Sequence, residues 1–192
     1  MTTPGGCCIS RGVNGPLALT CLRILAVPVL VIFLLTDFRG HDSLAFAVFL
    51  VATLTDMLDG YWARRKKQIT VLGQLLDPTA DKLIVVSALI CLVGRGTVPA
   101  WMAVIIIGRE IAVTGFRALA SARGINIPAS VWGKIKMNLE TVTIGLILLG
   151  EGVLGRFYVL TRWGLWLTVV AALVSAAEYY IRYGRAVLSG RP

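Results

Sequence analysis

The sequence predicts an all-α integral membrane protein with six transmembrane helices. Of its 192 residues, 57% are hydrophobic and only 15% are charged, and the mean hydropathy is +0.80. A soluble domain usually has about 45–50% apolar residues. Several apolar runs approach the roughly 20 residues that an α-helix needs to cross the core of a bilayer. These observations favour a polytopic membrane protein with a single domain over residues 1–192.

The elements follow from the order of apolar runs and breaks. Residues 1–15 are polar and glycine-rich, as in a short tail or interfacial segment, and the apolar run that follows starts too late for a cleavable signal peptide. The predicted spans cover residues 17–38, 43–64, 72–93, 98–120, 129–150 and 157–182. Glycines or basic residues, which favour turns and membrane edges, end them in the order Gly40, Arg64, Gly94, Gly124, Gly150 and Arg182.

Basic residues predict how the spans are oriented. The formal net charge is +9, and the second loop alone holds Arg64, Arg65, Lys66 and Lys67. Because loops rich in lysine and arginine stay in the cytoplasm, both termini are expected there. The positive charge also suits anionic lipids and phosphorylated substrates. A nucleic-acid partner is not expected, since it would leave the hydrophobicity unexplained.

Cysteine and histidine usage excludes several kinds of chemistry. The cysteines, at positions 7, 8, 21 and 91, fit neither a disulfide framework nor a zinc site. The single histidine, His41, lies in a short polar break. Hydrolases that use a Ser/His or Cys/His pair are therefore excluded.

Acidic residues gather in one segment. The chain has 10 acidic residues, and Asp56, Asp59, Asp77 and Asp81 lie close together in sequence. On helices, the first two aspartates share one face and the last two share another. The two helices are expected to be antiparallel neighbours, so that the pairs face each other near the cytoplasmic boundary. A charge at mid-bilayer costs about 2.5–3.5 kcal/mol, so four carboxylates need compensation.

Two divalent cations would compensate these carboxylates. Ligand sets made only of oxygen favour Mg²⁺ or Mn²⁺, and paired metals suit an in-line phosphoryl displacement. Two local alternatives stay open. Asp77 could cap a helix that begins with Pro78, and the first two aspartates could pair with Arg64 and Arg65.

The spacing in this segment resembles a known family signature. From Asp56 to Asp81 the chain reads D-x2-D-G-x2-A-R-x8-G-x3-D-x3-D, which is similar at every position to the signature of the CDP-alcohol phosphatidyltransferases. The resemblance implies a six-helix membrane bundle, a homodimer, and a site for two divalent cations that opens to the cytoplasm. It also implies a CDP-linked donor and the release of CMP.

The same resemblance implies a role for each aspartate. Asp56, Asp59 and Asp77 would bind the metals. Asp81 would complete the second metal site and act as the general base on the acceptor hydroxyl. A carboxylate beside the acceptor can take the proton as the oxygen attacks.

Further residues of the signature are implied to bind the donor. Gly60 and Ala63 would let the nucleotide approach the helix backbone, Arg64 would contact a donor phosphate, and Thr70 and Gly73 would lie near the nucleotide. Ordinary helix packing remains an alternative for the small residues. For Arg64 the alternative is the cytoplasmic charge bias.

Residues outside the signature resemble the phosphatidylglycerophosphate synthases within the family. The N-terminal N-x-P-x-x-L-T-x-x-R pattern supplies Asn14, Thr20 and Arg23 as further donor-binding candidates. An R-E-I pattern begins at Arg109, and Ser130 begins an S-x-x-G-K-x-K pattern.

Four basic residues in these patterns are candidates for binding the acceptor phosphate. They are Arg109, Arg117, Lys134 and Lys136. A cation as deep in a span as Arg109 is expected to face the bundle interior or a wet cavity.

The alternatives for this pocket are internal pairing and exposure at the membrane surface. Arg109 could pair with Glu110 or Glu140, and the two lysines could extend their amines to the interface. Glu140 also stands where the synthases tend to have glutamine, which places a negative charge near the expected phosphate.

The expected activity is transfer of phosphatidyl from CDP-diacylglycerol to the 1-hydroxyl of glycerol 3-phosphate. The products would be phosphatidylglycerophosphate and CMP, formed by direct displacement at the cytoplasmic face of a bacterial inner membrane. Within the family, the alternatives are inositol phosphate, serine or phosphatidylglycerol as acceptor. Outside it, the alternative is a divalent-cation transporter that uses the four carboxylates as its ion path.

Overall fold

The computed structural model describes the backbone of residues 15–66, 71–125, 127–128 and 130–189, and side chains within residues 22–55, 82–125, 127–128 and 130–185. These residues form helices and no strand. The elements are α1 (Gly15–Leu35), α2 (His41–Lys66), α3 (Val71–Gly94), α4 (Ala100–Ala122), α5 (Val131–Leu154), the 3₁₀ helix η1 (Gly155–Tyr158) and α6 (Val159–Ser189). The prediction of an all-helical chain with helices in these places is confirmed.

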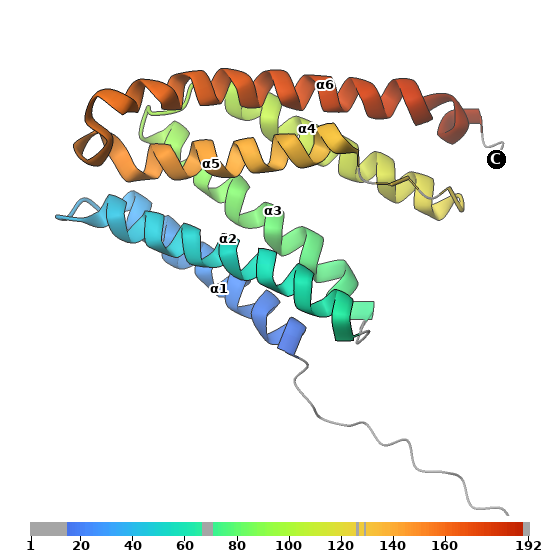
Figure 1. The fold of residues 1–192 in the computed structure, drawn as a ribbon, viewed down its shortest axis with the longest axis horizontal. Helices are drawn as coiled ribbons and strands as arrows, with labels where there is room; N and C mark the ends of the chain where they lie inside the picture. Colours follow the sequence, from blue (N-terminus) through green and yellow to red (C-terminus); the bar gives the residue numbers. More distant parts are fainter. Residues whose placement is uncertain (1–14, 67–70, 126, 129, 190–192) are drawn as a thin grey trace, which may run out of the picture.

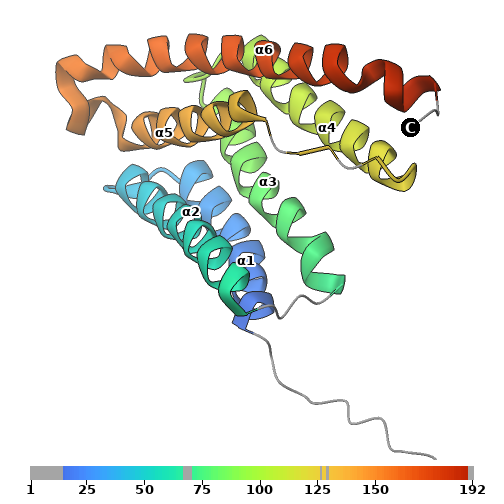
Figure 2. The ribbon, with the colours of Figure 1, turned by 45° about the vertical axis from the view of Figure 1, so that its right-hand side comes forward.

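The helices pack as two antiparallel pairs, and the two remaining helices, α3 and α4, each pack against one of these pairs. α1 and α2 form one pair, and α5 and α6 form the other, along the opposite side of the molecule (Figure 1). α3 packs against α1, and α4 packs against α6 (Figure 2). This arrangement brings α3, α4, α5 and α6 around one shared space.

One helical segment, Val131–Arg185, is long and apolar enough to cross a membrane, among the residues whose side chains are described. It contains α5, η1 and α6, and the chain reverses direction within it (Figure 1). Gly150 and Gly155, with φ of 73° and 51°, permit the reversal because glycine adopts positive φ without steric cost. Shorter apolar helices occupy Leu22–Leu35, His41–Thr55 and Lys82–Gly94.

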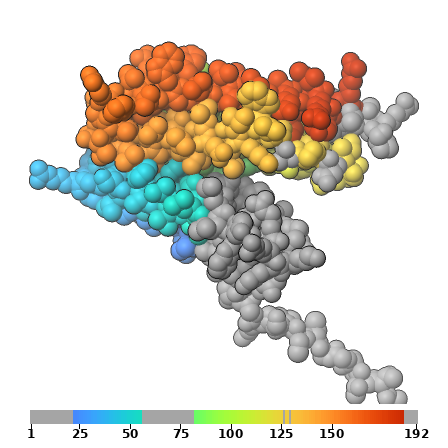
Figure 3. All heavy atoms as spheres, in the orientation of Figure 1, coloured from blue at the N-terminus to red at the C-terminus, as the bar shows by residue number. Residues whose placement is uncertain are grey.

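The outer surface of the helices is apolar. Large hydrophobic side chains are exposed on every α-helix, and examples in chain order are Leu25, Val51, Ile90, Val104, Val142 and Ile181. Exposure of so many large apolar side chains suits contact with lipid. In Figure 3, α6 extends along one whole edge of the molecule.

Two hydrophobic clusters hold the helices together. The larger cluster contains residues from all six α-helices. It includes Leu30, Phe49 and Leu89, each at most 2% exposed. The smaller one joins the second half of α4 to α6 through Phe116 and Tyr179, which are also buried. The smaller cluster therefore supports the end of the bundle at which α4, α5 and α6 surround a pocket.

α5 and α6 approach closely at Gly164. A Cβ atom at this position would lie 2.7 Å from Oγ1 of Thr143, closer than such atoms normally come. Thr143 is 2% exposed, and its Oγ1 lies 3.4 Å from Oγ1 of Thr168. The glycine thus permits a helix spacing that a larger residue would widen.

Candidate functional site

The four aspartates lie on the two helices expected to carry them. Asp56 and Asp59 lie in the C-terminal part of α2, and Asp77 and Asp81 lie in the N-terminal half of α3, with residues 67–70 between the helices. α3 begins at Val71, so the interpretation of Asp77 as a helix N-cap is wrong. The aspartate side chains lie outside the described part of the structure, as do their possible pairs with Arg64 and Arg65. Among the side chains that are described, no group of three His, Cys, Asp or Glu could hold a metal ion.

The donor-binding candidates also fall largely outside the described side chains. Asn14 and Thr70 lie outside the described residues altogether. Gly60, Ala63 and Arg64 lie in α2, Gly73 lies in α3 and Thr20 lies in α1, and only their backbone is described.

Arg23 is the one donor-binding candidate with a described side chain. It is 3% exposed and lines a groove of about 410 Å³ between α1 and α2. The groove is otherwise mostly apolar, and Thr55 lies at its wall, next in sequence to Asp56. A buried cation therefore lies beside the helix turn that leads into the acidic segment.

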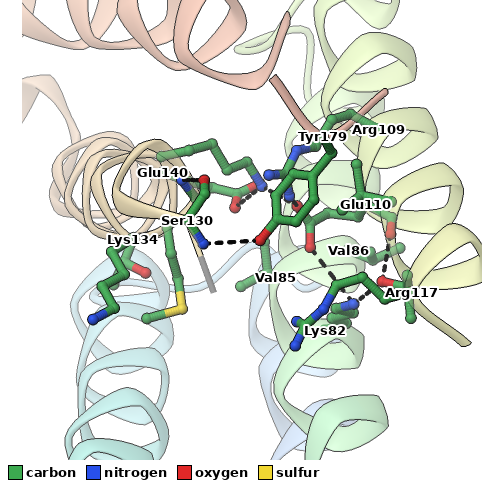
Figure 4. A pocket seen from close by; sticks show the side chains of 16 residues that line it. Lys82, Val85, Val86, Arg109, Glu110, Arg117, Ser130, Lys134, Glu140 and Tyr179 are labelled. Carbon is green, nitrogen blue, oxygen red and sulfur yellow. Dashed lines mark hydrogen bonds and ion pairs between the residues drawn. The ribbon is translucent and has the colours of Figure 1, made fainter. Parts of the chain in front are cut away.

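The basic candidates converge on one pocket. This pocket, of about 380 Å³, lies between α3, α4, α5 and α6 (Figure 4). Its charged lining residues are Lys82, Arg109, Glu110, Arg117, Lys134, Lys136 and Glu140. Five are basic and two are acidic, so the lining has a formal net charge of three positive. All four predicted phosphate ligands are thus brought together.

The pocket also adjoins the acidic segment. Lys82 is the residue that follows Asp81 in α3, and its amine donates a hydrogen bond to Oγ1 of Thr114 on α4. The same amine lies 3.9 Å from Oε2 of Glu110. The basic pocket therefore begins one residue from the last aspartate of the signature.

The buried part of the pocket is an ion-pair network centred on Glu110. Its Oε1 accepts from Nη1 of Arg109 at 2.5 Å and from Nζ of Lys136 at 2.6 Å. Lys136 also donates to Oε2 of Glu140 at 2.5 Å. The Lys136 side chain is 2% exposed, so the idea that it extends to the interface is wrong. The alternative that Arg109 pairs with Glu110 is confirmed.

The negative charge of Glu140 is compensated within this network. The side chain is 5% exposed and pairs with Lys136 one helical turn earlier. Its second oxygen, Oε1, is buried without a hydrogen-bond partner among the described residues. Because a buried charge is tolerated when it is paired, Glu140 and Lys136 together add no net charge to the pocket.

The exposed part of the pocket is formed by Arg117 and Lys134. Both side chains are exposed, and neither has an ion-pair or hydrogen-bond partner among the residues that the structure describes. They lie on different helices, α4 and α5, and both line the pocket. These two cations are therefore the ones that a bound anion can reach without breaking an internal pair.

Two residues of α6 complete the site, although no sequence motif pointed to them. Oγ of Ser175 accepts hydrogen bonds from Nε and Nη2 of Arg109 at 3.0 and 2.7 Å. The hydroxyl of Tyr179 accepts from the backbone N–H of Ser130 at 3.0 Å. Ser175 and Tyr179 are four residues apart, so they share one helix face. The sequence could have indicated Ser175 and Tyr179 as site residues, because two polar residues at helical spacing stand out in an otherwise apolar helix.

Ser130 explains the first part of the S-x-x-G-K-x-K pattern. It is the N-cap of α5, and its Oγ accepts from the N–H of Gly133 at 3.0 Å. Serine is favoured at this position because its oxygen pairs with an otherwise unpaired N–H group at the helix start. The cap fixes where α5 begins and so places Lys134 and Lys136 beside the pocket.

Comparison with known proteins identifies the family of the chain. A family model described as CDP-alcohol phosphatidyltransferase matches residues 13–174. The chain is 37% identical over 183 residues to a CDP-diacylglycerol–glycerol-3-phosphate 3-phosphatidyltransferase of Bacillus subtilis, a match that covers 87% of this chain and 93% of that protein.

Two other relatives have similar names. A protein of Cereibacter sphaeroides with the same name as the Bacillus protein is 36% identical over 167 residues, or 85% of this chain and 75% of its own length. A protein of Mycobacterium tuberculosis named "Probable phosphatidylglycerophosphate synthase" is 44% identical over 137 residues, or 68% of this chain and 64% of its own length.

Proposed function

The chain belongs to the CDP-alcohol phosphatidyltransferase family, and from this membership we propose that it transfers phosphatidyl from CDP-diacylglycerol to glycerol 3-phosphate. The products are phosphatidylglycerophosphate and CMP. The names of the relatives support this acceptor over inositol phosphate, serine or phosphatidylglycerol. Membership of an enzyme family also sets aside the cation-transporter alternative.

The observation that carries the proposal is the convergence of the basic residues beside Asp81. Arg109, Arg117 and Lys134 come from two helices and line one pocket, whose wall includes Lys82, the residue next to Asp81. A phosphorylated acceptor held here would have its hydroxyl end near the acidic segment. The excess of three positive charges favours an acceptor that carries a phosphate.

The acceptor phosphate is held mainly by Arg117 and Lys134. Both are exposed at the pocket and have no internal partner among the described residues. Arg109 is 10% exposed and adds the two guanidinium N–H groups that its internal partners do not use. Lys136 stays paired with two carboxylates and acts as a structural cation. Charge-assisted hydrogen bonds of this kind are the strongest available to a phosphate.

The reaction is a direct displacement at phosphorus. The acceptor hydroxyl oxygen forms a bond to the phosphorus of the phosphatidyl group, and the bond from that phosphorus to the CMP oxygen breaks. Asp81 takes the hydroxyl proton, and CMP leaves with the electron pair of the broken bond. The donor is held by the acidic and small-residue segment from Asp56 to Gly73, by Thr70, and by the N-terminal candidates Asn14, Thr20 and Arg23.

Two divalent cations, Mg²⁺ or Mn²⁺, are proposed to be held by Asp56, Asp59, Asp77 and Asp81. The donor set fits such ions, because all of its atoms are carboxylate oxygens and it comes from two helices joined by a short connection. When bound, the ions would neutralise the charge of the donor phosphates and of the leaving group.

The proposed setting is a bacterial inner membrane. The chain is proposed to form one domain, to cross the membrane six times with both termini and the active site in the cytoplasm, and to assemble as a homodimer. The apolar helix surfaces support the membrane location, as does the apolar length of Val131–Arg185.

The test is release of CMP by the purified, detergent-solubilised protein. With CDP-diacylglycerol, Mg²⁺ and glycerol 3-phosphate, the protein should release CMP and form phosphatidylglycerophosphate. A panel with inositol phosphate, serine and phosphatidylglycerol as acceptors identifies the preferred one. Asp81→Asn should still bind CDP-diacylglycerol but should not turn over.

Absence of CMP release with every acceptor would exclude the proposed activity. A clear preference for another acceptor would retain the family chemistry and replace only the assignment of glycerol 3-phosphate.

A further inference from the structure

Arg109 is held from two sides inside the bundle. Its guanidinium has five N–H groups in one plane. Nε and Nη2 each donate to Ser175 on α6, at 3.0 and 2.7 Å, and Nη1 donates to Glu110 at 2.5 Å. Because the two acceptors lie on different edges of the group, the plane of the guanidinium has a single orientation. Two N–H groups, one on Nη1 and one on Nη2, have no partner among the described residues and can bind a ligand.

Ser175 has a hydrogen-bonding arrangement suited to this task. It is fully buried, and its own hydroxyl proton is donated to the carbonyl oxygen of Ala172 at 3.1 Å. A hydroxyl has one proton and two lone pairs. Since the proton is directed along α6, both lone pairs are available to Arg109. Every hydrogen-bonding site of Ser175 is therefore used.

The neighbouring elements direct the guanidinium toward the pocket. On the α5 side, a Cβ atom at Gly133 would lie 3.9 Å from Nη2 of Arg109. One helical turn beyond Ser175, Tyr179 lines the pocket and accepts from Ser130 at the start of α5. α6 thus contacts both Arg109 and the segment that carries Lys134.

We propose that Ser175 is a positioning residue that orients Arg109 toward the phosphate of the acceptor. This inference rests on the proposed function and adds to it a specificity role for α6, a helix that carries none of the family signature. Ser175 does not touch the substrate and acts through Arg109. Its removal should therefore weaken acceptor binding and leave donor binding unchanged.

The test compares Ser175→Ala with Thr168→Val, which also removes a buried hydroxyl from α6. The Thr168 hydroxyl donates to Gly164 O in its own helix and does not line the pocket. Ser175→Ala removes both hydrogen bonds that orient Arg109. It should raise the KM for glycerol 3-phosphate about tenfold, which corresponds to the loss of one well-oriented hydrogen bond from Arg109 to the phosphate. The KM for CDP-diacylglycerol should stay the same, and Thr168→Val should change neither KM.

A double-mutant cycle tests whether the effect passes through Arg109. In an Arg109→Lys background, Ser175→Ala should have little further effect, because lysine lacks the planar fork that Ser175 orients. An equally large effect in both backgrounds would overturn the proposal. So would an unchanged KM for glycerol 3-phosphate, or equal increases in both KM values.

Calorimetric titration with glycerol 3-phosphate separates this inference from the proposed function. Loss of affinity in Ser175→Ala, with Thr168→Val unaffected, supports the positioning role even if the wild-type protein releases no CMP. Equal affinities in the wild-type protein and Ser175→Ala would overturn the role whatever the activity.

Discussion

At the scale of single residues, Lys134 and Lys136 have opposite environments although they are two positions apart. Lys134 is exposed at the pocket, whereas the Lys136 side chain is 2% exposed and lies between Glu110 and Glu140. Residues two apart on a helix point to nearly opposite sides, since one turn takes 3.6 residues. The two lysines of the K-x-K pattern therefore differ in role: Lys136 balances internal charge, and Lys134 is the one proposed to bind the anion.

Removing each lysine should have a different effect. Lys134→Met should raise the KM for glycerol 3-phosphate on the order of tenfold, with thermal stability unchanged. Lys136→Met should lower the free energy of unfolding by about 3 kcal/mol or more, because it leaves the buried carboxylate of Glu140 without its cation and removes one of the cations paired with Glu110. Initial-rate kinetics and thermal unfolding in detergent measure the two effects.

The two variants serve as controls for each other. Similar losses of stability in both would show that Lys134 is also part of the packing. A normal unfolding temperature for Lys136→Met would contradict the network as a source of stability.

Glu140 provides a second prediction at this scale. Glu140→Gln removes one negative charge and raises the formal charge of the pocket lining from three to four positive. The KM for glycerol 3-phosphate should therefore fall, by roughly threefold to fivefold for a unit charge at intermediate dielectric. Initial rates at varied glycerol 3-phosphate concentration test this.

Glu178→Gln is the matched control for this change. Glu178 also has a buried carboxylate oxygen without a partner among the described residues, but it does not line the pocket. The control should leave the KM unchanged. A rise in KM for Glu140→Gln would instead indicate that Glu140 holds Lys136 in a position that the acceptor needs.

At the scale of elements, the contact between α5 and α6 sets the shape of the site. α5 carries Lys134, and α6 carries Ser175 and Tyr179, so the spacing of the two helices determines how these side chains meet Arg109. The two helices approach each other closely at Gly164, against Thr143. Small residues at such points allow membrane helices to pack by direct contact of their backbones.

Gly164→Ala should weaken this packing. The added methyl group would lie 2.7 Å from Oγ1 and 3.1 Å from Cγ2 of Thr143, and overpacking in a filled interior costs about 1–3 kcal/mol. A lower unfolding temperature in detergent, followed by tryptophan fluorescence, is the expected result.

Gly115→Ala in α4 is the control. A Cβ atom there would meet nothing within 4 Å, and alanine favours helix over glycine. Its unfolding temperature should be unchanged or higher. If Gly164→Ala were equally stable, Thr143 would have room to move and the close approach would not limit helix spacing.

At the scale of the whole molecule, the bundle places a basic pocket next to an acidic segment. The basic pocket and the acidic segment both lie on helices whose outer faces are apolar. They adjoin on α3, where Lys82 directly follows Asp81. Opposite charges at adjacent positions suit a reaction that joins an anionic acceptor to a donor held through divalent cations. If the acidic segment holds the divalent cations as proposed, activity should depend on metal ions.

Removal of divalent cations should abolish activity. Treatment with EDTA should stop CMP release, and an excess of Mg²⁺ or Mn²⁺ should restore it. EDTA should act by removing the ions that are proposed to compensate the four carboxylates, and added metal should act by replacing them. Comparison of the two ions at equal concentration identifies the preferred metal.

A readout of acceptor binding completes this experiment. Under EDTA, the calorimetric affinity for glycerol 3-phosphate should fall much less than the activity does. The positive charges that line the basic pocket belong to lysine and arginine side chains and not to metal ions. Full activity in the presence of EDTA would contradict the proposed metal site.

Much of the fold could be predicted because membrane helices leave a plain pattern in sequence. Apolar runs about 20 residues long are needed to cross a bilayer, and the six predicted runs correspond to α1 to α6 with boundaries that differ by a few residues. The larger difference is at the end of α6, which continues to Ser189. Apolarity alone does not mark this end, because a helix can continue beyond the membrane with polar residues.

The sequence by itself determined the helical class, the family and four of the five basic residues that line the pocket, and it missed Lys82. These depend on composition and on fixed spacings, which are present in the sequence without a structure. Only the tertiary structure decided how the cations divide. Arg109 and Lys136 are paired internally, whereas Arg117 and Lys134 are open to a ligand. That division depends on which side chains from α4, α5 and α6 face one another, and pairing between distant helices leaves no periodic pattern in the chain.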